Sequence, residues 1–241
     1  MITFQVTYES RKKEIEEFLE LMEFLEKKEN DRIDGVSKFS MFFYNKDEAI
    51  SMSYQSLINI LKSNVSLMIY NIIEYTVSNL IDSIYDEIRI NHLSYVDVNE
   101  SIRALWRKTI LKSARDPNAS FNTFLKKNEE IIETILKNTT LQMQSRNTLP
   151  DGNLDGITIR ETFESHGIHV QTSSQNYRPD ILENIKENRN NLAHGSVSFV
   201  EAVRADSISD IKRNEAFVIA FLEELISTVT AYITDQKYKI S

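Results

Sequence analysis

The stretch QSLINILKSNVSLMIYNIIEYTVSNLIDSIYDEIRI, residues 55–90, decides the fold. Its apolar residues recur at three- and four-residue steps and cover more than half the circumference of a helix. They are Leu57, Ile60, Leu61, Val65, Leu67, Met68, Ile72, Ile73, Val77, Leu80, Ile81, Ile84 and Ile88. A helix that is apolar on most sides is buried, so we expect this segment to be the central helix of the protein.

The rest of the sequence also favours helices, because only 5 Gly and 3 Pro occur among 241 residues. Apolar periodicity and end signals predict further helices at about 9–29, 97–113, 120–138, 154–165, 179–192 and from 207 or 209 to 235. Asp116-Pro117-Asn118 is the expected break between two of them, and residues 139–153 are expected to form an exposed linker. Residues 31–54 show no clean periodicity; a long connection or a short strand-like excursion fits them, and they stay unassigned.

These patterns predict an all-α protein, a bundle built on long antiparallel helices. We expect residues 55–241 to form the main helical domain. Residues 1–54, a helix and an irregular connection, are expected to pack on it, so that the whole chain forms one globular unit.

Membrane insertion and export are not expected from this sequence. Polar residues interrupt the central segment, which makes it a poor membrane span of about 20 residues; they are Lys62, Asn64, Asn71, Glu74 and Asp82. The N-terminus has no apolar run behind a basic start, as a signal peptide would have. We expect a cytoplasmic protein without membrane contact.

Charge and motifs exclude several classes of function. The net charge of −8 argues against broad attraction to nucleic acid, so any RNA binding must be local. The sequence has no cysteine, no H-E-x-x-H pattern, no phosphate-binding loop and no nucleophile elbow. We therefore expect neither a metal ion nor another cofactor.

Two arginine–histidine pairs could carry chemistry. Arg189 and His194 are separated by four residues, and Arg160 and His166 by five. Side chains five positions apart on an unbroken helix diverge by roughly 140°, so the helix must end or bend inside the first motif. A glycine follows each histidine and can end a helix, so spacing and geometry alone leave the two pairs tied.

The segment RNNLAHGSVSF, residues 189–199, resembles the motif of HEPN proteins, in which an arginine and a polar residue precede a histidine. Here Asn190 is the polar residue. The segments LMIYNIIEYTVSNLIDSIYDEI (67–88), GNLDGITIRE (152–161) and TAYITDQKYKI (230–240) are similar to a family of stand-alone bacterial HEPN proteins. The resemblance covers most of the chain from about residue 55 onward and favours Arg189 and His194 over Arg160 and His166, which we assign to structure.

The resemblance implies a homodimer in which two motifs face each other across one cleft and form a composite active site. It further implies a metal-independent endoribonuclease, because RNA carries its own nucleophile in the 2′-hydroxyl. Histidine can move the protons and arginine can hold the phosphate. The products would be a 2′,3′-cyclic phosphate and a 5′-hydroxyl.

Three residues are candidates for supporting roles. Asn71 and Glu74 lie three apart, on one helix face, and could orient Arg189 or His194; the alternative is a solvated polar stripe. Arg204 could add a phosphate contact or be an ordinary surface arginine.

Relatives with these features also suggest a toxin or antiphage effector with an antitoxin or defence partner protein. One alternative is a non-catalytic HEPN module that binds RNA, a nucleotide or a protein partner. Another is a structural helical adaptor with Arg189 and His194 held in local hydrogen bonds.

Overall fold

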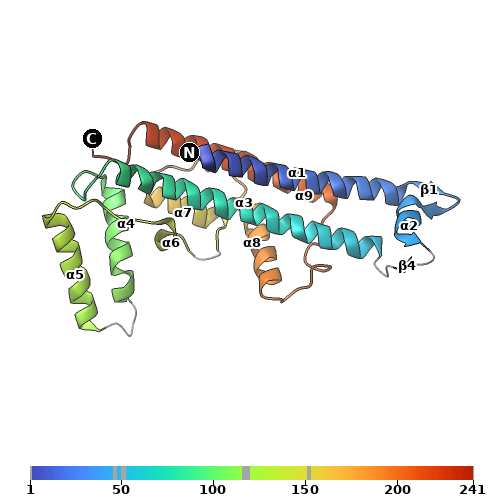
Figure 1. The fold of residues 1–241 in the computed structure, drawn as a ribbon, viewed down its shortest axis with the longest axis horizontal. Helices are drawn as coiled ribbons and strands as arrows, with labels where there is room; N and C mark the ends of the chain where they lie inside the picture. The colour runs from blue at the N-terminus through green and yellow to red at the C-terminus, as the bar shows by residue number, and fades with distance from the viewer. Residues whose placement is uncertain (1, 46–47, 50–52, 116–119, 151–152, 241) are drawn as a thin grey trace. The chain divides into compact units, whose positions relative to one another are not determined.

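The computed structural model describes residues 2–45, 48–49, 53–115, 120–150 and 153–240 (Figure 1). Within these ranges the regular secondary structure consists of helices and two short antiparallel strand pairs, joined by turns and loops. The predicted all-α fold class is therefore confirmed.

The helices correspond closely to the periodic segments of the sequence. They are α1 Ile2–Asn30, α2 Lys38–Phe43, α3 Tyr54–Ile90, α4 Glu100–Ile110, the 3₁₀ helix η1 Leu111–Arg115, α5 Phe121–Leu136, α6 Ser145–Thr148, α7 Gly156–Ser165, α8 Pro179–Ala193 and α9 Ile208–Thr234. The strands are β1 Arg32–Ile33, which pairs with β2 Val36–Ser37, and β3 Tyr44–Asn45, which pairs with β4 Glu48–Ala49.

The chain divides into two compact units. The first comprises Met1–Glu74 and Arg178–Ala220, and the second comprises Tyr75–Tyr177 and Phe221–Ser241. Each of the long helices α3 and α9 contributes a part to both units. The domain boundary expected at residue 54 stays a prediction.

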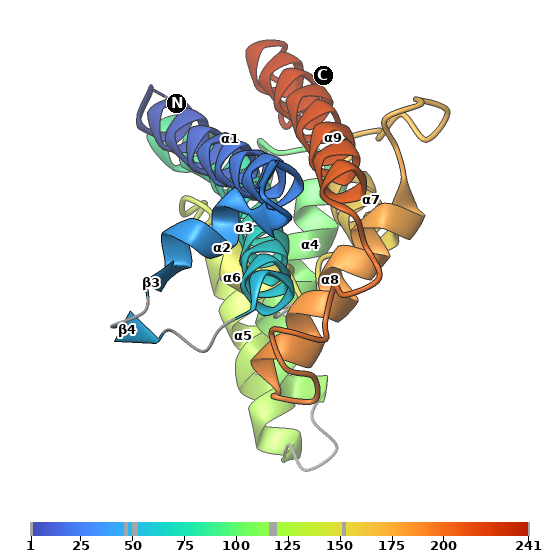
Figure 2. The same ribbon diagram turned by 90° about the vertical axis from the view of Figure 1, so that its right-hand side faces the viewer.

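In the first unit, α1 runs antiparallel to the first part of α3 (Figure 2). Thr7 near the start of α1 lies beside Met68. Glu26 near the end of α1 lies close enough to Lys62 for its charge to act on the pKa of that lysine in the upward direction. The core of this unit is formed by apolar side chains of α1, α3, α8 and α9, among them Ile15, Met22, Val65, Ile73, Leu182 and Val218. An ion pair between Lys212 and Glu23 links α9 to α1.

In the second unit, capping residues set the helix starts. Asn99, Ser120 and Asp155 accept hydrogen bonds from the first turns of α4, α5 and α7. The core contains Val77, Ile81, Trp106, Phe163, Leu222 and Val229. The Asp82 carboxylate of α3 accepts hydrogen bonds from the backbone N–H and hydroxyl of Ser145, which fixes the segment around α6.

One expectation about a connection needs correction. Residues 139–153 are not a wholly exposed linker, because Leu141 and Met143 are buried in an extended stretch that packs every second side chain inward, and Leu149 is buried directly after α6. Residues 31–45, which the sequence left unassigned, form strands β1 and β2, helix α2 and strand β3. The expected break at Asp116-Pro117-Asn118 lies outside the described residues.

Helices α3 and α9 are long and apolar enough to cross a membrane, judged by length and composition alone. The core helices of soluble proteins meet the same test. In α3, 56% of the most apolar 18-residue stretch is buried, including Val65 and Ile73, so this helix packs as the core helix that the sequence predicts.

Candidate functional site

Helix α8 carries the motif and is well defined at both ends. Pro179 lies in its first turn, where its missing N–H costs nothing. Its last turn ends in a Schellman motif, in which Ser196 N–H donates to the Asn191 carbonyl and Gly195 N–H to the Leu192 carbonyl. Gly195 has a φ of +67°, which only glycine adopts easily. The helix therefore ends inside the motif, as predicted.

Arg189 is held against α3. Its Nη2 lies 3.4 Å from Glu74 Oε1, and its guanidinium carbon lies 4.7 Å from the centre of the Tyr70 ring. Nη1 donates a 2.9 Å hydrogen bond to Asn190 Oδ1. Both partners of the ion pair are partly exposed, at 26% for the Arg189 side chain and 32% for Glu74. The guanidinium is thus oriented from three sides and still reachable from solvent.

The side chain of His194 has a different environment from that of Arg189. It is the C-cap residue of α8, with φ −87° and ψ −3°, and its side chain is exposed. The imidazole makes no hydrogen bond or ion pair with any residue in the described part of the chain. Its ring nitrogens are therefore available to a ligand or a second chain.

The structure does not bring Arg189 and His194 together within one chain. Because His194 keeps nearly helical backbone angles, the two side chains leave the helix in directions roughly 140° apart. Of the supporting candidates, Glu74 and Asn190 contact Arg189. Asn71 lies instead at a small pocket beside α1, lined also by Arg11 and Met68.

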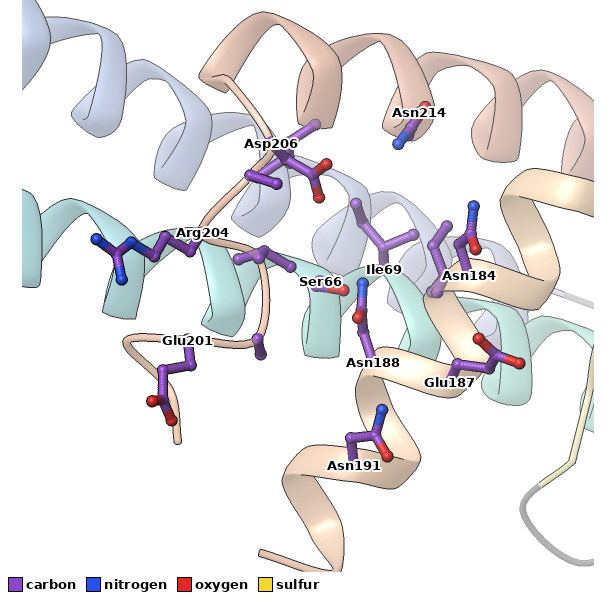
Figure 3. Close-up of a pocket in the computed structure, with 15 residues that line it drawn as sticks. Ser66, Ile69, Asn184, Glu187, Asn188, Asn191, Glu201, Arg204, Asp206 and Asn214 are labelled. Carbon is purple, nitrogen blue, oxygen red and sulfur yellow. The ribbon is translucent and has the colours of Figure 1, made fainter. Parts of the chain in front are cut away.

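A larger pocket of about 690 Å³ opens on another side of α8 (Figure 3). It lies between α8, Ser66 and Ile69 of α3, the segment 201–206 and the start of α9. Arg204 lines it, but the guanidinium points away from the asparagines that dominate the pocket (Figure 3). The motif residue that reaches this pocket is Asn191.

The second arginine–histidine pair lies in the second unit and is structural. His166 is fully buried. Its Nδ1 lies 2.7 Å from the Thr162 carbonyl, which can only accept, so Nδ1 carries the proton. Nε2 lies 2.6 Å from the Tyr85 hydroxyl. Burial lowers the pKa of His166 to about 4, so this imidazole is neutral at pH 7.

Sequence reasoning missed two features of the site. The Tyr70 ring beneath Arg189 looked like an ordinary core residue of the central helix. Four asparagines around the larger pocket, Asn184, Asn188, Asn191 and Asn214, were not singled out. Three of them recur on α8 at four- and three-residue spacing, a signal that was present in the sequence.

The observations define a class: a helical protein whose motif helix presents an oriented arginine and ends in an exposed histidine. Among the described residues, no group of three or more His, Asp or Glu gathers as a metal site would require. Residues 5–238 match the family described as HEPN_MAE_28990-like HEPN. The match covers nearly the whole chain, and the chain belongs to this family. Searches of curated protein sequences and of solved structures gave no significant match.

Proposed function

We propose that this HEPN protein is an endoribonuclease that cleaves RNA without a metal ion and acts as a homodimer. The observation that carries the proposal is the contrast at the end of α8, where Arg189 is oriented and His194 is exposed and unpaired within the described structure. Membership of a HEPN family over residues 5–238 supports it.

The chemistry follows from the residue types. The RNA 2′-oxygen attacks the adjacent phosphorus, the bond from phosphorus to the 5′-oxygen breaks, and a 2′,3′-cyclic phosphate and a 5′-hydroxyl result. One imidazole takes the 2′ proton or gives a proton to the leaving 5′-oxygen. The Arg189 guanidinium binds the phosphate oxygens and offsets the charge that develops on them.

The contacts of Arg189 fit this role. Tyr70 and Asn190 hold the guanidinium plane, and Glu74 holds one edge of it at 3.4 Å. A phosphate approaching from solvent would replace part of the Glu74 interaction, because a partly exposed ion pair is worth only about 0–1 kcal/mol. Glu74 and Asn190 are thus positioning residues, and Arg204 adds a phosphate contact at the edge of the site.

A dimer supplies what one chain lacks. Arg189 and His194 diverge on a single helix, so a phosphate cannot contact both from one copy. A twofold arrangement of two α8 ends would bring the two His194 side chains together in one cleft, each beside Arg189 of the other protomer. We place this enzyme in the cytoplasm as a toxin or antiphage effector that is restrained by an antitoxin or defence partner protein.

The test is cleavage of total cellular RNA by purified wild-type protein and by His194→Ala, with EDTA present and with analysis of fragment ends. We expect cyclic-phosphate and 5′-hydroxyl ends from the wild type and their loss in the variant. Absence of cleavage by a folded wild-type dimer, or undiminished cleavage by His194→Ala, would contradict the proposal.

A second candidate is a non-catalytic HEPN module that binds RNA, a nucleotide or a protein. The net charge of −8 and the ion pair that already engages Arg189 favour it. The salt dependence of RNA binding separates the two, because log affinity falls with log salt in proportion to the phosphates contacted. A flat response without cleavage favours protein binding.

A further inference from the structure

The pocket beside α8 is walled by an anchored segment of backbone. Lys62 Nζ donates to the Asp206 carbonyl at 2.7 Å, and Ser63 Oγ donates to the Phe199 carbonyl at 2.7 Å. Both side chains are buried in α3, so the segment from Phe199 to Asp206 is fixed at its two ends. The pocket is therefore preformed, which lowers the cost of ordering it around a ligand.

Amide side chains dominate the lining. Asn184, Asn188 and Asn191 follow one another along α8, and Asn214 comes from α9 (Figure 3). None of these four side chains makes a hydrogen bond with another residue in the described ranges. Each amide offers two N–H donors and one carbonyl acceptor, so the pocket has a large unused hydrogen-bonding capacity.

Three asparagines elsewhere on helices behave differently, although Asn71 and Asn122 also make no such bond to any described residue. Asn64 donates to the Ile60 carbonyl, Asn79 to the Tyr75 carbonyl and Asn128 to the Phe124 carbonyl, each four residues back. This local bond satisfies an asparagine that has no other task. The pocket asparagines do not make it, and their amides stay directed at the pocket.

The charge of the lining narrows the ligand. The lining contains three acidic residues, Glu187, Glu201 and Asp206, and one basic residue, Arg204. The pocket therefore has a net negative charge and repels a phosphate group. Carboxylates and asparagine carbonyls accept hydrogen bonds from amino groups. Ala202 and Ala205 line the pocket and offer apolar surface to a flat ring, whereas Ile69 and Ile185 are almost wholly buried. A neutral, planar, amino-bearing group meets all three conditions.

We propose that this pocket binds a nucleobase with an amino group on its major-groove edge, adenine through N6 or cytosine through N4, in preference to uracil. Asparagine pairs with adenine through two hydrogen bonds, and a carboxylate accepts from the cytosine amino group. The Arg204 guanidinium points away from the amides, outside the place of the base, and can bind the phosphate next to this base in the RNA strand. Where the base belongs to substrate RNA, the inference rests on the proposed function, because the pocket then selects the sequence that is cut near His194.

The direct test measures binding of adenosine, inosine, cytidine and uridine by isothermal titration calorimetry. Inosine is the matched control, because it carries a carbonyl oxygen where adenosine carries the amino group. We expect adenosine and cytidine to bind about tenfold or more tightly than inosine and uridine. Asn188→Leu and Asn191→Leu should abolish this preference, whereas Asn64→Leu, which removes a local amide bond on α3, should leave it. Asn188→Asp keeps the side-chain size and removes both donors, so it serves if Asn188→Leu does not fold.

A second arm separates RNA from a free nucleotide as the source of the base. A pocket that serves the substrate gives cleavage sites in random-sequence RNA with adenine or cytosine at a fixed offset, and Asn188→Leu removes that bias. A pocket for a free nucleotide gives binding of adenosine monophosphate without such a bias. His194→Ala should bind nucleosides like the wild type. Selective nucleoside binding by a wild-type protein that does not cleave RNA would therefore contradict the proposed nuclease function and support the proposed nucleobase pocket. Absent or unselective nucleoside binding, or selective binding unchanged in both asparagine variants, overturns the pocket.

Discussion

Helices α7 and α8 end in the same way and put a histidine in the same place, yet the two histidines have opposite environments. In α7 the Gly167 N–H donates to the Glu164 carbonyl and the Ile168 N–H to the Phe163 carbonyl, the same Schellman motif as in α8. His166 and His194 are the C-cap residues. His166 is fully buried, and His194 is exposed.

The difference comes from the two residues that the motif brings together. A Schellman turn places the residue after the glycine near the residue three positions before the histidine. In α7 these are Ile168 and Phe163, both buried, and they draw the histidine into the core. In α8 they are Ser196 and Asn191, both exposed. The same backbone turn thus buries its histidine in one unit and exposes it to solvent in the other.

The largest expected effect is a loss of RNA cleavage on substitution of Arg189 but not of Arg160. Arg189→Ala should lower kcat/KM for RNA cleavage about 10²- to 10³-fold, because one oriented donor to the developing phosphate charge is lost. Arg160→Ala is the matched change in the other pair, where the guanidinium lies 3.8 Å from Glu161 and Glu164. It should leave kcat/KM within about twofold, since surface changes away from a site are small. Equal losses in both variants would remove the distinction.

Substitution of the two histidines should change the free energy of unfolding by different amounts. His166→Ala removes the contacts to the Thr162 carbonyl and the Tyr85 hydroxyl and leaves a cavity, at a cost of about 2–4 kcal/mol in the free energy of unfolding. His194→Ala should change that free energy by less than about 0.5 kcal/mol. Urea denaturation measures both, and a small effect at His166 would contradict its structural assignment.

The pH dependence of stability should follow His166. Its folded pKa of about 4 lies below the usual 6.5, so between these values the unfolded chain binds a proton that the folded chain does not. Stability therefore falls as the pH decreases through this window, by about 2 kcal/mol between pH 7.5 and pH 5. Urea denaturation of wild type and His166→Gln at both pH values gives the difference, and an equal acid loss in the two proteins would show that another group is responsible.

The smallest effect expected concerns the positioning of Arg189. Glu74→Gln keeps the size of the side chain but removes the charge at 3.4 Å from the guanidinium, so cleavage should fall about three- to tenfold with little change in stability. Glu23→Gln is the control, because Glu23 pairs with Lys212 in the same unit. An unchanged kcat/KM in Glu74→Gln would show that Tyr70 and Asn190 suffice to hold Arg189.

Much of the fold could be predicted because apolar periodicity marks helices strongly. The central helix was expected from Gln55 and begins at Tyr54, and the end of α8 at Gly195 was expected from the glycine. The short strands were only one of two alternatives left open for residues 31–54, and α2 was not predicted, because elements of two to six residues carry too few positions to show a period. The buried alternation of Leu141, Met143 and Ser145 was hidden by the polar residues within it.

The site was predictable only in part. The sequence suggested a tie between the two arginine–histidine pairs, although Ile168 and Ser196 already differ at the position that decides burial. An orienting role of Glu74 toward Arg189 or His194 was one of two alternatives left open, beside a solvated polar stripe, and the carboxylate lies 3.4 Å from Arg189. Asn71, three residues earlier, lies instead beside α1, which residue spacing on one helix cannot foresee because it depends on the neighbouring helix.

The most direct test of the account asks whether two His194 side chains meet. The chain has no cysteine, so His194→Cys introduces a single thiol, and His169→Cys provides a matched control at another exposed histidine. A disulfide requires Cα atoms within about 7 Å. After mild oxidation we predict that most of the His194→Cys protein becomes a covalent dimer and that the His169→Cys protein does not become covalently crosslinked. Failure of His194→Cys to crosslink above the His169→Cys level would contradict the composite site.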